Sequence, residues 1–270
     1  MVVRHAPFPL SSAMYRQEFI QNILNIGGDM RALWIPNATD TTTTTDETRH
    51  GQTWTYNHSV ATFDSSMTRI GNGYEVVFNG TDEEADTGNN SRYTFGDGAI
   101  DQPFSVFALV RVVAGTTFQA ILSKQDLTTG STKREWIFYV NAQEQPGLQL
   151  YDDSTTSAYI GRKDGSALTT NTRYFLTATY DGTGVARGIR VYVNAVRLDD
   201  EADSGGSGTY VAMENTAAPL QLAHILDTST AADLFWTGRM GLVGLTAKEL
   251  NVHEIWQMKE AINAYYDLSL

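Results

Sequence analysis

The amino-acid sequence predicts an all-β protein, a β-sandwich built from two antiparallel sheets. Two strands with alternating apolar residues lie between Arg173 and Asp200, joined by a glycine-rich turn. A period of two places one face of each strand against a core. Further short strand signals recur from Tyr74 onward, separated by turn residues at the spacing that is typical of a sandwich. The 13 Tyr and 11 Phe residues, together with many Thr and Val, also favour strands.

The other predicted strands follow in order along the chain. They begin near Tyr74, Arg92, Phe104, Phe118, Arg134, Gly147, Ser157, Leu220 and Phe235. The segment Phe104 to Val113 is apolar on both faces in its middle, which predicts a central strand covered on both sides. The threonine run at 41–45 predicts an exposed loop or an edge segment.

Two helices are predicted to flank the sandwich. Pro7 and Pro9 favour an extended lead-in, and a helix with an apolar side fits Ser12 to Leu24. Such a helix must pack, either on its own domain or on a partner subunit. Residues 1–32 are therefore interpreted as an N-terminal arm for anchoring or homo-oligomerisation, and 33–270 as one domain. A second helix is expected from Ala247 to Tyr266. Its predicted buried stripe comprises Val252, Ile255, Lys259, Ile262 and Tyr266.

Composition restricts the classes of partner. The 270 residues are 41% hydrophobic and 19% charged, as in a globular protein, and the net charge of −12 disfavours nucleic acid and anionic membranes. The chain has no cysteine, which excludes disulfides and thiolate zinc ligands. No apolar run approaches about 18 residues, so no membrane insertion is expected. The N-terminus lacks the apolar core of a signal peptide, and synthesis in a cytoplasm is expected.

Several motifs resemble those of laminin-G-like, concanavalin A-like jelly rolls of the lectin and glucanase type. FNGTDEE at Phe78, DQPFSVFALVRV at Asp101 and ILSKQD at Ile121 resemble the first half of that fold. RYFLTATYDGTG with IRVYVNAV resembles its hallmark strand pair, and WTGRMGLVGLTAKELNVHEI resembles its closing strand. The resemblance covers residues 54–255 and implies a jelly roll. One departure is Asn194-Ala195, where the family has Asn-Gly. Because Ala tolerates positive φ poorly, a different turn is expected there.

The chain as a whole is similar to bacteriophage virion proteins that carry such a domain. The similarity rests on the order of three features: an apolar N-terminal segment, the motif LWIPNAT and a cysteine-free jelly roll. This resemblance implies a non-enzymatic virion component that decorates the capsid or associates with the tail and is made in the host cytoplasm. Its implied partners are other virion proteins or its own subunits, through the arm, and cell-surface glycans. The alternative is a free-standing carbohydrate-binding module, which could depend on calcium.

Catalytic motifs are not found in the sequence. Glycoside hydrolysis needs two carboxylates about 5 to 9 Å apart, and the Glu-x-Asp-x-x-Glu motif of related glucanases does not occur. The acidic residues from Asp82 to Asp86 are interpreted as a solvated loop. There is no Gly-x-Ser-x-Gly elbow, and the glycines of DGTGVARG join two strands instead of a strand and a helix. No catalytic residue and no enzymatic activity are predicted.

Binding candidates are drawn from residues near predicted loops. Calcium needs several oxygen ligands, and Asp126, Asp152 and Asp153 lie at strand ends, where turn formation explains them equally well. Sugar binding would use an exposed aromatic platform beside amide and carboxylate groups. The aromatic candidates are Tyr151, Tyr159, Tyr210 and Trp236, with burial in the sandwich as the alternative. The five histidines form no metal-type pair and are expected to be surface or hydrogen-bonded residues.

Overall fold

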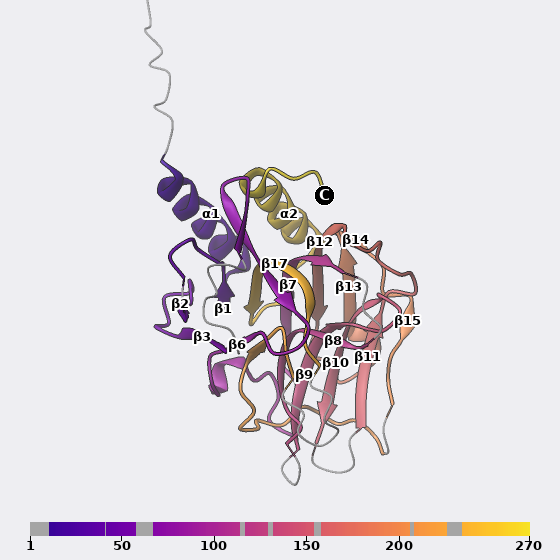
Figure 1. Ribbon diagram of the computed structural model, residues 1–270. Helices are drawn as coiled ribbons and strands as arrows, with labels where there is room; N and C mark the ends of the chain where they lie inside the picture. The colour runs from indigo at the N-terminus through magenta and orange to yellow at the C-terminus, as the bar shows by residue number, and fades with distance from the viewer. Residues whose placement is uncertain are drawn as a thin grey trace, which may run out of the picture.

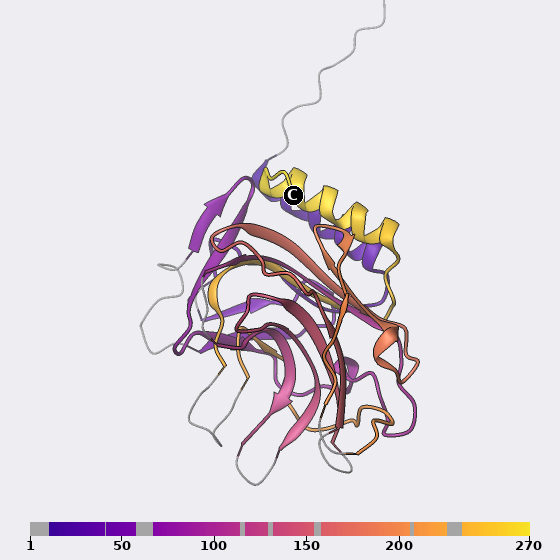
Figure 2. The ribbon, with the colours of Figure 1, turned by 90° about the vertical axis from the view of Figure 1, so that its right-hand side faces the viewer.

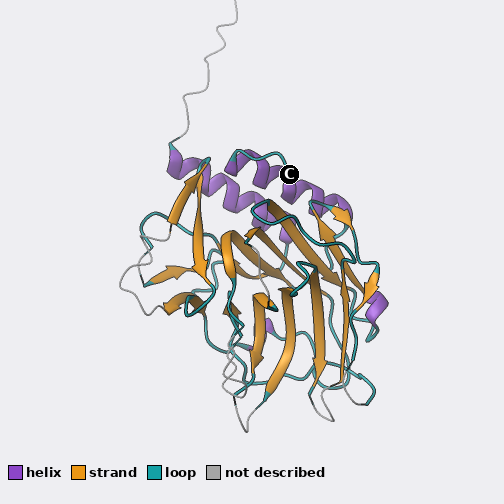
Figure 3. Cartoon of the chain, turned by 45° about the vertical axis from the view of Figure 1, so that its right-hand side comes forward, coloured by secondary structure: helices purple, strands orange, loops and turns teal. Residues whose placement is uncertain are grey.

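The computed structural model describes residues 11–40, 42–57, 67–113, 117–128, 132–153, 158–205, 208–225 and 234–270. Two antiparallel sheets pack face to face as a jelly-roll sandwich, and two helices lie together on one side of it (Figures 1 and 3). The predicted fold class is confirmed. The predicted lead-in at residues 1–10, with His5, and the segment containing His58 lie outside the described residues.

Among the described residues, eight strands form the first sheet. Their order is β14 (Val196–Arg197), β13 (Ile189–Val193), β12 (Arg173–Tyr180), β7 (Phe104–Val112), β17 (Thr237–Thr246), β5 (Gly73–Asn79) and β4 (Met67–Ile70), and β1 (Met30–Trp34) also pairs with β17. Nine described strands form the second sheet, in the order β15 (Glu201–Ala202), β11 (Ala158–Lys163), β10 (Pro146–Asp152), β9 (Lys133–Val140), β8 (Gln119–Asp126), β16 (Gln221–Leu222), β6 (Glu84–Asp86), β3 (Thr53–Asn57) and β2 (Thr43–Thr45).

Strand β7 has the central position that its doubly apolar sequence predicts. It lies between β12 and β17. Phe104 and its alternate neighbours point into the core between the sheets, while Phe107 and Leu109 belong to a second cluster with the helices. The Phe104 ring stacks on Phe95 with centroids 4.4 Å apart, and Trp136 packs 5.6 Å away. The hydrophobic pattern therefore predicts correctly that both faces of this strand are covered, one by the second sheet and the other by the helices.

The helices α1 (Ser12–Gly27) and α2 (Val252–Tyr266) cover the outer face of the eight-stranded sheet, as Figure 2 shows from the side. Phe19 of α1 stacks on Tyr265 of α2, with ring centroids 4.1 Å apart. Helix α1 therefore packs on its own domain, which is the first of the two predicted alternatives, and β1 spans the proposed boundary at residue 32. The role of the arm stays a prediction. Within the described residues, no helix is long and apolar enough to cross a membrane.

Helix α2 begins later than predicted because a capping box stops it at its N-terminus. Asn251 accepts from the backbone of His253 and Glu254, and the Glu254 side chain accepts from the Asn251 amide. Of the predicted stripe, Ile255, Ile262 and Tyr266 are buried and Lys259 is half-buried. Val252 is 59% exposed, contrary to the prediction. Successive residues of a helix are rotated by about 100°. Ile255 and Ile262 therefore lie near the middle of the buried face, and Val252 lies at its edge.

Other local predictions differ from the structure. The predicted strand at 92–98 is instead a 3₁₀ turn, Ser91–Tyr93, followed by one isolated bridge at Gly96. The Asn90 side chain accepts from the Arg92 amide at 3.1 Å and so competes with an extended backbone. The threonine run supplies the edge strand β2, as predicted, and part of the acidic stretch predicted as a loop forms β6.

The hairpin between β13 and β14 keeps a two-residue turn despite its alanine. Asn194 has φ of 51° and Ala195 has φ of 66°, so the expectation of a different turn is wrong. Asn194 exchanges hydrogen bonds with Phe175, donating at 2.8 Å and accepting at 2.9 Å. The Ala195 methyl group also packs against the helix-side cluster. These contacts offset the cost of left-handed backbone, about 1–2 kcal/mol for a residue with a Cβ.

Candidate functional site

Two of the predicted aromatic residues meet on the outward face of the nine-stranded sheet. In β10, Leu148 and Leu150 point into the core, so the alternation turns Gln149 and Tyr151 to the other face. Tyr151 is the cross-strand partner of Tyr159 in β11. Their rings lie 5.3 Å apart at 33°, which is within the range of favourable aromatic pairs.

A hydrogen-bond network surrounds this pair. Asp203 accepts from Gln149 Nε2 at 2.7 Å and from the Tyr139 hydroxyl. The Tyr151 hydroxyl donates to Gln149 Oε1 at 2.5 Å. We call Tyr139, Gln149, Tyr151, Tyr159 and Asp203 the tyrosine cluster. Because each polar group in the chain of bonds orients the next, the amide and the carboxylate are held in fixed positions.

Two glycines provide the space for the tyrosine cluster. A Cβ on Gly147 would lie 2.4 Å from the Tyr139 hydroxyl, and one on Gly161 would lie 2.2 Å from the Asp203 carbonyl oxygen. Both distances are shorter than any ordinary van der Waals contact. The alternation of GLQLYD and these two glycines are therefore the sequence signals for the site, although sequence reasoning missed Tyr139, Gln149 and Asp203.

An arginine borders the cluster. The Arg134 guanidinium lies 5.0 Å from the centre of the Tyr151 ring, a cation–π contact. The same guanidinium donates to Asp153 Oδ1 from Nε at 3.0 Å and from Nη2 at 2.7 Å. Asp153 is therefore neutralised by an arginine.

The tyrosine hydroxyls of the cluster are neutral donors. Burial, the largest cause in each case, raises the pKa of Tyr139, Tyr151 and Tyr159. Tyr139 is fully buried, whereas Tyr151 and Tyr159 keep part of their surface exposed. An approaching ligand would therefore meet these two rings first, with the carboxylate and the amide beside them.

The other two aromatic candidates lie elsewhere. The Tyr210 hydroxyl donates to Asp101 Oδ2 at 2.7 Å, beside the Tyr180 hydroxyl at 2.6 Å. Trp236 is 0% exposed and belongs to the sandwich core, so its interpretation as an exposed ligand-binding residue is wrong. Its backbone amide donates to the Ala223 carbonyl at 2.8 Å just before β17 begins. The Trp236 ring therefore lies in the core directly before the closing strand begins.

The three calcium candidates all accept hydrogen bonds within the protein, and Asp126 and Asp153 also form ion pairs. Asp126 accepts from the Thr128 amide at 2.9 Å and pairs with Lys133 at 3.5 Å. Asp152 is buried and accepts from the Val211 amide at 2.8 Å, and Asp153 pairs with Arg134 as described above. Within the described ranges, no three His, Cys, Asp or Glu side chains form a group that could hold a metal ion. The geometry therefore fits the turn interpretation for Asp126, whereas Asp152 and Asp153 accept from residues distant in the sequence.

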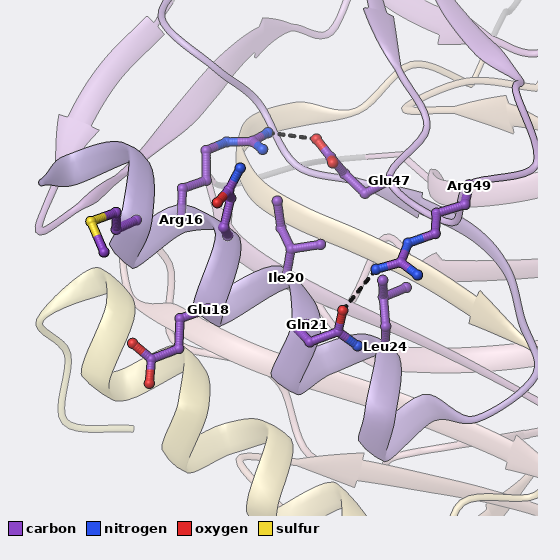
Figure 4. Close-up of a pocket in the computed structure, with 9 residues that line it drawn as sticks. Arg16, Glu18, Ile20, Gln21, Leu24, Glu47 and Arg49 are labelled. Carbon is purple, nitrogen blue, oxygen red and sulfur yellow. Dashed lines mark hydrogen bonds and ion pairs between the residues drawn. The ribbon is translucent and has the colours of Figure 1, made fainter. Parts of the chain in front are cut away.

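A separate groove of about 740 Å³ runs beside α1 (Figure 4). Ile20 and Leu24 line it from the helix. Two side-chain contacts join the helix to the following loop: Arg16 pairs with Glu47 at 2.7 Å, and Arg49 donates to Gln21 at 2.9 Å. No sequence signal indicated this groove, because it combines residues from α1 with a loop about thirty positions away.

Fold and site together define a lectin-like β-sandwich. The family model described as the Concanavalin A-like lectin/glucanases superfamily matches residues 86–256, and this chain belongs to that superfamily. The resemblance inferred from the sequence motifs is thereby confirmed. A search of curated proteins found no match.

Several solved structures share the fold at low identity. The binding domain of Paraclostridial Mosquitocidal Protein 1 is 10% identical with a TM-score of 0.60, and the match covers 87% of this chain and 52% of that one. Botulinum neurotoxin type C is 11% identical with a TM-score of 0.61, covering 89% and 53%. A sialidase of Trypanosoma rangeli is 12% identical with a TM-score of 0.55, covering 94% and 38%. This chain thus spans about half of the two toxin chains and less of the sialidase, and the likeness concerns the fold alone.

Proposed function

We propose that this protein is a non-catalytic glycan-binding domain whose ligand site is centred on Tyr151 and Tyr159. The observation that carries the proposal is the partly exposed aromatic pair beside a hydrogen-bonded amide and carboxylate. Aromatic rings offer the apolar contact that the faces of sugar rings need. A carboxylate accepts hydrogen bonds from sugar hydroxyls, and an amide accepts through its oxygen and donates through its nitrogen.

The fold neighbours support glycans as the ligand class. Cell entry of botulinum neurotoxin type C depends on interaction with two ganglioside molecules. The binding domain of botulinum neurotoxin DC, which has a TM-score of 0.56 to this chain, is described in complex with SialylT. Because the matches span about half of those chains, the ligand of this protein is inferred from its own tyrosine cluster.

The carboxylates near the cluster favour binding over hydrolysis. Hydrolysis needs one carboxyl group as an acid and a second as a base or nucleophile. Here Asp203 accepts from both Gln149 and Tyr139, and Asp153 is paired with Arg134. Both groups are thus engaged in holding the site together, and a binding function without calcium fits them better.

The ring of Tyr159 provides the first test. We expect Tyr159→Ala to weaken binding of the best ligand on a glycan array about tenfold, because the stacking contact is lost. Tyr159→Phe retains the ring and should bind as the unmodified protein does. Tyr15→Ala, which removes a 40% exposed tyrosine on α1, controls for general effects. Affinities would be measured by titration calorimetry with the array ligand.

Two outcomes would count against this site. One is a glycan array that stays blank with and without calcium, and the other is full affinity in Tyr159→Ala. Binding that appears only with calcium would instead favour a calcium-dependent carbohydrate-binding module.

A more specific role, display on a bacteriophage virion as a capsid or tail component, is also proposed. The observation that favours it is the groove beside α1, where the N-terminal arm presents the apolar residues Ile20 and Leu24 together with Arg16, which pairs with Glu47. A virion protein or a second subunit would bind there, leaving the tyrosine cluster on the opposite sheet free for glycans.

Attachment through the arm can be tested by deletion. Removal of residues 1–32 would also remove the buried Phe19 and Ile23, so the suitable variant lacks only residues 1–10. We expect it to lose attachment, measured as copies of the chain per purified virus particle, and its melting temperature serves as the control for folding. An undiminished copy number would contradict anchoring by this segment.

A further inference from the structure

Three arginines lie side by side on neighbouring strands of the eight-stranded sheet. Arg111 of β7 is the cross-strand partner of Arg173 in β12 and of Arg239 in β17. These three strands are adjacent in the middle of the sheet (Figure 1). Directly opposed residues share one face, with Cβ atoms about 4.5–5.5 Å apart. We call Arg111, Arg173 and Arg239 the arginine row.

The arginine row lies on the outer face of the sandwich. Val110, Val112 and Met240, the neighbours of Arg111 and Arg239 along their strands, are buried in the core between the sheets. Alternation therefore turns the arginines outward, to the face on which Leu109 meets the helices. All three arginines are partly exposed, and the Arg173 side chain is 31% exposed. A ligand in solution can thus reach the row.

The positive charge of the row is only partly neutralised. Arg173 forms a two-pronged ion pair with the buried Glu75, from Nε at 2.7 Å and from Nη2 at 2.9 Å. Among the described residues, Arg111 donates only to the Asn171 carbonyl and side-chain oxygens, at 3.0 and 3.4 Å, and both are uncharged. Arg239 forms no hydrogen bond or ion pair with any described residue. Like charges directly opposite on a sheet destabilise it, and a bound anion would relieve that repulsion.

We propose that the arginine row binds the carboxylate or sulfate group of an acidic saccharide. A guanidinium presents parallel N–H donors that match the two oxygens of such groups, and Arg111 and Arg239 occupy directly paired positions on the same face of neighbouring strands. The net charge of −12 opposes the approach of a long polyanion such as nucleic acid. A saccharide with one or two anionic groups interacts mainly with the arginine row, because salt screens the more distant negative charges. The saccharide part of this proposal rests on the proposed glycan binding, but the site is on the other sheet.

The test compares a sulfated oligosaccharide with its desulfated counterpart by titration calorimetry. The full chain should bind the sulfated probe, and Arg239→Gln should weaken that binding about tenfold or more. Arg187→Gln removes an exposed arginine outside the row and should change affinity less than about twofold, since exposed charges interact weakly at a distance. Tyr159→Ala should retain sulfate-dependent binding, so loss of the tyrosine cluster and loss of the row are distinguishable.

A second measurement keeps the result independent of folding defects. Without ligand, Arg239→Gln should melt at the same temperature as the unmodified protein or higher, because a like-charge contact is removed. The rise in melting temperature caused by the sulfated probe should disappear in this variant. Equal binding of the desulfated probe would overturn the proposal, as would equal binding of a single-stranded DNA oligonucleotide, or unchanged affinity in Arg239→Gln.

Discussion

Replacing Glu135 by alanine is expected to lower the free energy of unfolding by about 3–5 kcal/mol, because it leaves a buried ammonium group without its counter-charge. Lys124 and Glu135 are both 0% exposed, and Nζ lies 2.9 Å from Oε1. Burial lowers the pKa of Lys124 and raises the pKa of Glu135, which is the signature of desolvation acting on both partners.

The pair also joins the nine-stranded sheet to a distant segment. Lys124 donates to Asn89 Oδ1 at 3.0 Å and to the Ala218 carbonyl at 2.9 Å. Glu135 accepts from the Thr216 amide and hydroxyl, each at 2.8 Å. Loss of the carboxylate would therefore release the segment around Thr216 as well as leave a charge unpaired.

The effect would be measured by urea unfolding, with an exposed pair as the control. Glu201, which pairs with Lys163, is 49% exposed, and Glu201→Ala should cost less than about 1 kcal/mol. The double variant Lys124→Met with Glu135→Leu should recover most of the loss, because no buried charge remains. A double variant as unstable as Glu135→Ala would show that the cost has another origin.

The second large effect is expected for Asp101→Ala, which should lower the free energy of unfolding by about 3 kcal/mol because it removes the acceptor of three hydrogen bonds, two of them buried. The carboxylate accepts from the hydroxyls of Tyr180 and Tyr210 and from the Met213 amide, at 2.6, 2.7 and 2.9 Å. Tyr180 in turn accepts from the Gly184 amide at 2.6 Å, so the network also fixes the turn after β12.

Tyr210→Phe is the matched control, since it removes one of the three donors and should cost only about 1 kcal/mol.

The pH dependence gives a further check. Burial raises the pKa of Asp101 above its usual 3.8, so the folded protein holds this proton more tightly than the unfolded chain. The contribution of Asp101 to the free energy of unfolding therefore falls as the pH rises from the usual pKa of 3.8 through the raised pKa. The free energy of unfolding lost in Asp101→Ala should be larger near pH 4 than at about pH 7. Equal losses at the two pH values would contradict the raised pKa.

Much of the fold could be predicted because periodicity reports which residues share a face. The doubly apolar run of β7 and the alternation of β12 and β13 predicted strands that the structure confirms. Predictions failed where a single contact overrides local preference. Asn90 caps a turn in a predicted strand, and the bonds between Asn194 and Phe175 hold Ala195 at a positive φ.

Only part of the candidate site could be predicted from the sequence. Tyr151 and Tyr159 were named because aromatic residues near loops fit sugar binding, and the pairing of β10 with β11 brings them together. The same reasoning named Trp236, which is buried, because a tryptophan suits a platform and a core equally well. Exposure depends on what covers a side chain, and that information is not local.

The class of fold, the central strand, the two helices and the absence of cysteine chemistry could be predicted without coordinates, since they follow from composition and from neighbours along the chain. The contacts between distant positions could not. Gln149 and Asp203 are 54 residues apart in sequence, and the arginine row gathers residues from three strands. The physical reason is that strand register and layer packing, which no local pattern encodes, bring such side chains within hydrogen-bonding distance.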